Sequence, residues 1–163
     1  MRPPYNVLFL CTGNSARSIM AEAIMNERGF PTFSAYSAGS HPKGAVHPAA
    51  LRQIESARLP TRKLRSKACA EFAKPGAPPL DFVFTVCNNA AEEVCPLSPG
   101  QTLTAHWGVP DPVAVEGTPE QIEMAFRDAF EVLDRRISLF LSLPLAGLDK
   151  LALKKEIDNI GHA

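Results

Sequence analysis

The sequence lacks long apolar runs, an excess of charge of either sign, internal repeats and low-complexity linkers. No stretch reaches the roughly 18 apolar residues that a membrane-spanning helix needs. The 17 basic and 17 acidic residues cancel, and no basic block stands out, so nucleic acid is not the expected partner. These absences leave one folded domain of 163 residues, long enough to bury a sizeable core.

The start of the chain and its cysteines bear on the cellular location. Residues 1–4 lead straight into a strand-like run, without the apolar stretch and cleavage site of a secretory signal peptide. The 4 cysteines have uneven spacings that do not suit a disulfide framework in a domain of this size. Working thiols are typical of a reducing compartment, so we expect a cytoplasmic protein.

The most informative stretch begins with an apolar run at residues 7–10, which predicts a buried strand. The run ends at Cys11, a small polar loop follows, and strong helix formers then extend from Ser18 to Met25. In such a strand–loop–helix unit the loop N–H groups and the helix N-terminus attract an anion. We therefore expect an oxyanion cradle that consists of seven residues: Thr12, Gly13, Asn14, Ser15, Ala16, Arg17 and Ser18.

Two residues of this stretch carry the chemistry. Cys11 and Arg17 are separated by five residues, so the loop can turn both side chains toward one centre. The guanidinium fork suits an oxyanion, and with the loop amides it favours thiolate over thiol at Cys11. Ser18 can donate its hydroxyl to that thiolate, and Asn14 can hold the shape of the loop. The alternative, a merely buried cysteine, leaves Arg17 and Ser18 unexplained.

Further along the chain, extended and helical segments alternate. Strands are predicted at residues 32–39, 80–86 and 103–107, and helices from Pro48 and at residues 66–72, where Cys69 is interpreted as a packing residue. The strongest helix signal is a capping box of Thr118 and Gln121 before an apolar stripe. Residues 143–163 suit an amphipathic helix that packs on the body, with dimerisation as the alternative.

Four strands that alternate with helices predict an α/β fold: a single three-layer domain over residues 1–163, with a four-stranded parallel sheet flanked by helices and a C-terminal helical extension at 143–163. The carboxyl ends of parallel strands share one edge of the sheet, where ligands bind. Cys11 follows the first strand, Cys87 the third and Asp111 the fourth. We expect all three at that edge.

Asp111 lies between Pro110 and Pro112, which stiffen its loop. A stiffened carboxyl beside an anion pocket is suited to protonate a departing oxygen as a general acid. An ordinary Asp-Pro turn is the alternative, but the place after the fourth strand favours catalysis. His41 and His47 have no acidic or thiol companion, so they are interpreted as turn or surface residues, of which one could line the pocket rim.

The pattern Cys11-x5-Arg17-Ser18 after an N-terminal strand resembles the low-molecular-weight protein tyrosine phosphatase superfamily, and the full spelling of residues 11–18 resembles its arsenate reductase branch. The resemblance implies a fold of the phosphotyrosine phosphatase I type, a Cys11 nucleophile and an acid at Asp111. The tyrosines that follow the Asp-Pro pair in tyrosine phosphatases are absent here. This difference favours a small inorganic oxyanion, arsenate, with phosphate as a competitor.

Cys87 and Cys95 separate two enzymatic interpretations. A phosphatase needs one cysteine, whereas reduction of arsenate to arsenite consumes two electrons and leaves a disulfide. Cys87 is placed to attack Cys11, and Cys95 to take the oxidation outward. On a helix the residues from 87 to 95 would rise about 12 Å, beyond the roughly 7 Å Cα limit of a disulfide, so pairing would require unwinding. Alternatively, both cysteines are simply buried.

The resemblance implies no metal and no bound organic cofactor, because an external thiol reductant supplies the electrons. Seven residues separate Cys87 from Cys95, one more than in thioredoxin-coupled relatives, so thioredoxin and glutathione with glutaredoxin both stay open. Ala16 replaces a further cysteine that many relatives carry. We expect a monomer or weak homodimer. A tyrosine phosphatase, a reductase with residual phosphatase activity, and a non-catalytic thiol protein that binds arsenite or senses oxidants are the alternatives.

Overall fold

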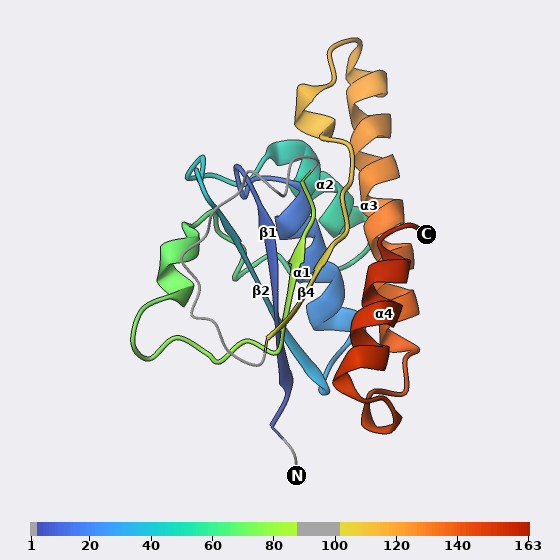
Figure 1. Cartoon of the computed structure of the whole chain (residues 1–163). Helices are drawn as coiled ribbons and strands as arrows, with labels where there is room; N and C mark the ends of the chain where they lie inside the picture. Colours follow the sequence, from blue (N-terminus) through green and yellow to red (C-terminus); the bar gives the residue numbers. More distant parts are fainter. Residues whose placement is uncertain (1–2, 88–101) are drawn as a thin grey trace.

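The computed structural model describes residues 3–87 and 102–163, in which four strands form one sheet (Figure 1). The order across the sheet is β2-β1-β3-β4, and every neighbouring pair is parallel. The strands are β1 (Tyr5–Cys11), β2 (Phe33–Gly39), β3 (Phe82–Thr85) and β4 (Leu103–His106). The predicted fold class, an α/β domain around a four-stranded parallel sheet, is confirmed.

The strand register brings the carboxyl ends of the strands level with one another. Cys11 pairs with Gly39 across β1 and β2, while Thr85 pairs with Leu10 on one side and with His106 on the other. The chain therefore leaves all four strands at one edge of the sheet. The segments that follow β1, β3 and β4 start close together, which is the condition for a shared site.

In the described residues four α-helices accompany the sheet: α1 (Arg17–Arg28), α2 (Pro48–Ser56), α3 (Pro119–Leu141) and α4 (Lys150–Ile160). The predicted capping box of α3 is present, because Gln121 N donates to Thr118 Oγ1 at 3.2 Å and Thr118 N donates to Gln121 Oε1 at 2.8 Å. The helix predicted at residues 66–72 is instead a single 3-10 turn, η1 (Cys69–Phe72). Among the described residues no helix has the length and apolarity to span a bilayer.

The two faces of the sheet are covered unequally. Val7 and Phe9 of β1 face a large core to which all four α-helices contribute, and α4 buries Leu153, Ile157 and Ile160 there. Alternate β1 residues face a small cluster in which η1 supplies Cys69. In Figure 1, α3 and α4 lie side by side in orange and red. The larger core therefore fixes the α-helices, including α1 with the loop before it.

Candidate active site

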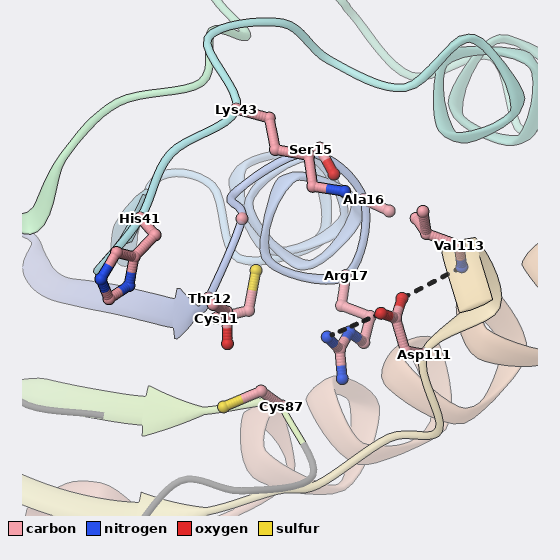
Figure 2. A pocket seen from close by; sticks show the side chains of 11 residues that line it. Cys11, Thr12, Ser15, Ala16, Arg17, His41, Lys43, Cys87, Asp111 and Val113 are labelled. Carbon is pink, nitrogen blue, oxygen red and sulfur yellow. Dashed lines mark hydrogen bonds and ion pairs between the residues drawn. The ribbon is translucent and has the colours of Figure 1, made fainter. Parts of the chain in front are cut away.

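A pocket lies at the carboxyl edge of the sheet, where the loop after β1 meets the segments after β3 and β4 (Figure 2). Figure 2 shows Cys11 at the tip of β1, Cys87 just beyond β3, and Arg17 facing Asp111. The structure therefore brings together the residues that topology predicts there. The lining residues are Cys11, Thr12, Gly13, Ser15, Ala16, Arg17, His41, Lys43, Cys87, Asp111 and Val113.

Two predicted cradle residues, Asn14 and Ser18, are fully buried behind the pocket rather than in its lining. Ser18 Oγ lies 2.9 Å from Cys11 Sγ, the contact that the sequence predicts. Asn14 Nδ2 donates to the same hydroxyl oxygen at 2.7 Å. Because this oxygen accepts from Asn14, the proton of the Ser18 hydroxyl can be directed at Cys11 Sγ.

The loop of residues 12–16, here called the oxyanion loop, has a tight backbone turn at Asn14. Asn14 has a φ of 44°, in the left-handed region that Asn tolerates better than most residues. Its Oδ1 accepts from the backbone N–H of Lys67 at 2.8 Å. A Cβ at Gly39 would clash with the carbonyl oxygen of Thr12 and press on Asn14. The end of β2 therefore supports the loop from below only because Gly39 has no side chain.

The outer side of the oxyanion loop is tied to the segment 41–47. The carbonyls of Thr12, Gly13 and Ser15 accept from backbone N–H groups of that segment at 2.8–3.0 Å. In a trans peptide the carbonyl and the next N–H point in opposite directions. The adjoining N–H groups therefore point away from the segment 41–47, which suits the predicted binding of an anion.

Arg17 and Asp111 face each other across the pocket. Arg17 Nη2 lies 3.6 Å from Asp111 Oδ2, and Arg17 Nη1 donates to the carbonyl of Val109 at 3.0 Å. The other carboxylate oxygen of Asp111 accepts from Val113 N at 3.0 Å. The Arg17 side chain is 8% exposed, against 36% for Asp111. The buried guanidinium of Arg17 thus faces the more exposed carboxyl group of Asp111 across the pocket.

A buried ion pair under the oxyanion loop was not predicted from the sequence. Lys67 Nζ lies 3.5 Å from Glu22 Oε1, and Ser37 Oγ donates to that oxygen at 2.6 Å. Burial raises the pKa of Glu22 and lowers that of Lys67, and their mutual attraction offsets part of each shift. One signal was available in the sequence: Glu22 is the one charged residue in the mostly apolar run 18–25, and a charge that is buried with such a run needs a partner.

The two histidines of the segment 41–47 differ in role. His41 lines the pocket, the alternative that the sequence left open for one of the two, whereas His47 caps α2 by accepting from Ala49 N at 3.1 Å. Burial, followed by the nearby Arg52, lowers the pKa of His47. Within residues 3–87 and 102–163, no group of three or more His, Cys, Asp or Glu side chains could hold a metal ion.

The described cysteines fall into two kinds. Cys11 and Cys87 are buried thiols, whereas Cys69 is disulfide-bonded. Cys69 packs in the smaller core as predicted, but its disulfide was not predicted. A disulfide depends on the distance between two cysteines in the folded chain. The alanines beside Cys69 in the sequence give no information on that distance. Cys95, with the predicted helical segment that would unwind, lies outside the described residues.

The chain matches the family "Low molecular weight phosphotyrosine protein phosphatase" over residues 6–157. An arsenate reductase of Shouchella clausii (strain KSM-K16) is 34% identical over 134 residues, which cover 82% of this chain and 93% of that protein. A structure titled "An arsenate reductase in oxidized state" has a TM-score of 0.68 at 22% identity and covers 84% of this chain and 96% of its own. A low molecular weight protein tyrosine phosphatase from T. tengcongensis has a TM-score of 0.66 at 22% identity, covering 82% and 95%.

Fold, site and sequence match together show that the chain belongs to the low-molecular-weight phosphotyrosine protein phosphatase family. Within this family it is related to arsenate reductases, so the resemblance of residues 11–18 to that branch is confirmed. The arsenate reductase structure and the phosphatase structure both resemble this chain in fold. The choice between the two activities therefore depends on the residues of the pocket.

Proposed function

We propose that the chain is an arsenate reductase that works through a relay of cysteines. One observation carries the proposal: a second thiol, Cys87, lines the same pocket as Cys11 and the arginine cradle. A phosphatase has no use for a second thiol there, whereas a two-electron reduction needs one. The relation to curated arsenate reductases supports the same choice.

In the first step the oxyanion loop and Arg17 hold the oxygens of arsenate, and the Cys11 thiolate attacks arsenic. Asp111 gives a proton to the departing oxygen, which leaves as water. The Ser18 hydroxyl, 2.9 Å from Cys11 Sγ, is placed to donate to the sulfur that attacks. The product of this step is an arsenic(V) adduct with a Cys11 sulfur–arsenic bond, so no electron has yet been transferred.

The second step moves two electrons. The Cys87 thiolate attacks Cys11 Sγ, a disulfide forms between them, and the sulfur–arsenic bond breaks with its electron pair remaining on arsenic, which leaves as arsenite. In the fully reduced protein Cys95 then attacks Cys87, which frees the Cys11 thiolate, and presents a new disulfide to thioredoxin or to glutathione with glutaredoxin. Because these reductants work in the cytoplasm and supply the electrons, the enzyme is cytoplasmic and needs no bound cofactor. Its expected assembly state is a monomer or weak homodimer.

The shape of the pocket supports a small substrate. Val113, the residue after the Asp111-Pro112 pair, lines the mouth, where tyrosine phosphatases carry aromatic residues. Phosphate has the same shape and charge as arsenate, so it should compete for the cradle. Hydrolysis of aryl phosphates should persist at a low rate, because Cys11, Arg17 and Asp111 suffice for that reaction.

The test is a thiol count with disulfide mapping on fully reduced protein, before and after one arsenate turnover, with and without glutathione. Loss of two thiols per arsenite, mapped to Cys11, Cys87 or Cys95, supports the relay. Cys87→Ser should bind phosphate normally but release no arsenite. Turnover only with glutathione would mean that glutathione, rather than Cys87, supplies the second thiol. Aryl phosphate hydrolysis without any arsenite would identify a phosphatase instead.

A further inference from the structure

Four charged side chains are buried in the part of the chain that the structure describes: Arg17, Glu22, Lys67 and Arg136. The first three have charged partners, because Arg17 faces Asp111 and Lys67 faces Glu22. Arg136 of α3 is 7% exposed, has no Asp or Glu side chain as a partner among the described residues, and leaves its Nε without a hydrogen bond there. Burying a guanidinium in this way costs free energy, and burial lowers its pKa.

The hydrogen bonds of Arg136 go to two main-chain oxygens. Its Nη1 donates to Gly108 at 2.9 Å and its Nη2 donates to Ala163 at 3.4 Å. Gly108 belongs to residues 107–112, here called the acid loop, which lead from β4 to Asp111. The next carbonyl, that of Val109, accepts from Arg17. Two consecutive carbonyls of the acid loop are thus held by two buried arginines.

The rest of the acid loop explains why these two bonds matter. Trp107 N and Val109 N donate to the carbonyls of Thr85 and Val86 at 2.7 and 3.0 Å, which continue the sheet past β3 and β4. After Val109, the residues on either side of Asp111 are prolines, which offer no N–H and fix φ. The position of Asp111 therefore depends on how Gly108 and Val109 are held.

We propose that Arg136 is a positioning residue for the acid loop: by holding the Gly108 carbonyl it sets the Val109 carbonyl that orients Arg17, and with it the place of Asp111. Arg136 does not line the pocket, so it acts on the oxyanion only through these residues. The inference rests on the proposed function for the role of Asp111 as acid. It gives a role to a buried arginine that has no Asp or Glu partner among the described residues.

The experiment compares Arg136→Met and Arg136→Lys with Ile137→Val, a neighbour on α3 that is fully buried and loses only a methyl group. The single-turnover rate of arsenate-dependent thiol loss is measured for each, with Asp111 present and in an Asp111→Asn background. Arg136→Met should slow the reaction about tenfold with Asp111 present and less than about twofold without it. Arg136→Lys, which keeps the charge but not the fork, should fall in between.

Ile137→Val should lower the melting temperature while leaving the rate within about twofold of the parent. The inference is wrong if Arg136→Met keeps the parent rate, or if it slows the reaction by the same factor in the Asp111→Asn background. It is also wrong if Ile137→Val slows the reaction as much as Arg136→Met does. If Arg136→Met does not fold, a parent-like rate for Arg136→Lys in both backgrounds overturns the inference. A parent protein without arsenate-dependent thiol loss refutes the proposed function instead, and the same comparison is then made with aryl phosphate hydrolysis.

Discussion

The oxyanion loop and the acid loop meet at one pocket but are stabilised in different ways. Buried polar side chains hold the oxyanion loop from behind: Asn14 bonds to Ser18 and to the backbone of Lys67, while Lys67 pairs with Glu22. The acid loop has backbone bonds to the sheet, two arginine-bound carbonyls and two prolines. The first arrangement positions the Ser18 hydroxyl against Cys11 Sγ, whereas the second positions the carboxyl group of Asp111.

This difference indicates which changes each loop tolerates. A hydrogen-bonded chain of buried side chains fails when one member loses its partner, because the remaining group stays buried and unsatisfied. A loop held mainly through its backbone tolerates side-chain changes and fails when its anchor outside the loop is removed. The predictions below use substitutions that separate these two behaviours, starting with the largest expected effect.

Replacing the nucleophile should abolish the reaction. Cys11→Ser is expected to lower the arsenate-dependent rate by at least about 10⁴-fold, since a hydroxyl without an adjacent base is a poor nucleophile. Phosphate should still bind, because the loop amides and Arg17 are unchanged. Ser18→Ala, which keeps Cys11 but removes its hydrogen-bond donor, is the companion variant and should lose much less. A Cys11→Ser rate within tenfold of the parent would contradict the assigned nucleophile.

Replacing the acid should affect rate and binding in opposite directions. Asp111→Asn is expected to slow the reaction about 10²-fold, because no proton reaches the departing oxygen. Phosphate affinity, measured by calorimetry, should rise, since the carboxylate 3.6 Å from Arg17 no longer competes with the anion. Asp134→Asn, which breaks the exposed pair with Arg28, is the control and should leave both quantities unchanged. Weaker phosphate binding by Asp111→Asn would refute this view of the pair.

Breaking the buried pair under the oxyanion loop should destabilise the fold. Lys67→Met leaves Glu22 buried without its cation and should cost about 3–5 kcal/mol of the free energy of unfolding in urea. The double variant with Glu22→Leu should recover part of this loss, because neither charge is then buried. If the double variant is no more stable than Lys67→Met, the stability of this region does not depend on the charge pair.

The smallest expected effect concerns pH. The pKa of His47 lies below its ordinary value of 6.5, so the unfolded chain binds more protons than the folded one between the two pKa values. Stability should therefore fall as the pH falls through this window, because the protonated ring can no longer accept from Ala49 N. His47→Asn, which keeps a capping side chain, should flatten the curve. Equal urea midpoints for the parent at pH 5.5 and 7.5 would contradict this.

Local signals predicted the fold and the front of the pocket. The run before Cys11, the capping box of Thr118 and the prolines around Asp111 each determine structure through adjacent residues, and parallel topology then brings Cys11, Cys87 and Asp111 to one edge. The rest depends on contacts between distant residues. The pairing of Glu22 with Lys67, the disulfide at Cys69 and the anchoring of Gly108 by Arg136 leave no short-range pattern, because each joins segments whose distance only the folded chain defines.

The strand order also has a consequence for the order of folding. The oxyanion loop is bounded by β1, α1 and β2, which are all complete by Gly39, whereas the bond from Arg17 to the acid loop joins residues 92 positions apart. Contacts of long sequence separation carry a larger loop-closure cost and form late. The segments that hold the oxyanion loop, up to Lys67, all precede the acid loop in the chain, so we expect the acid to be placed last. Phosphate, as a ligand of the cradle, should stabilise the folded chain.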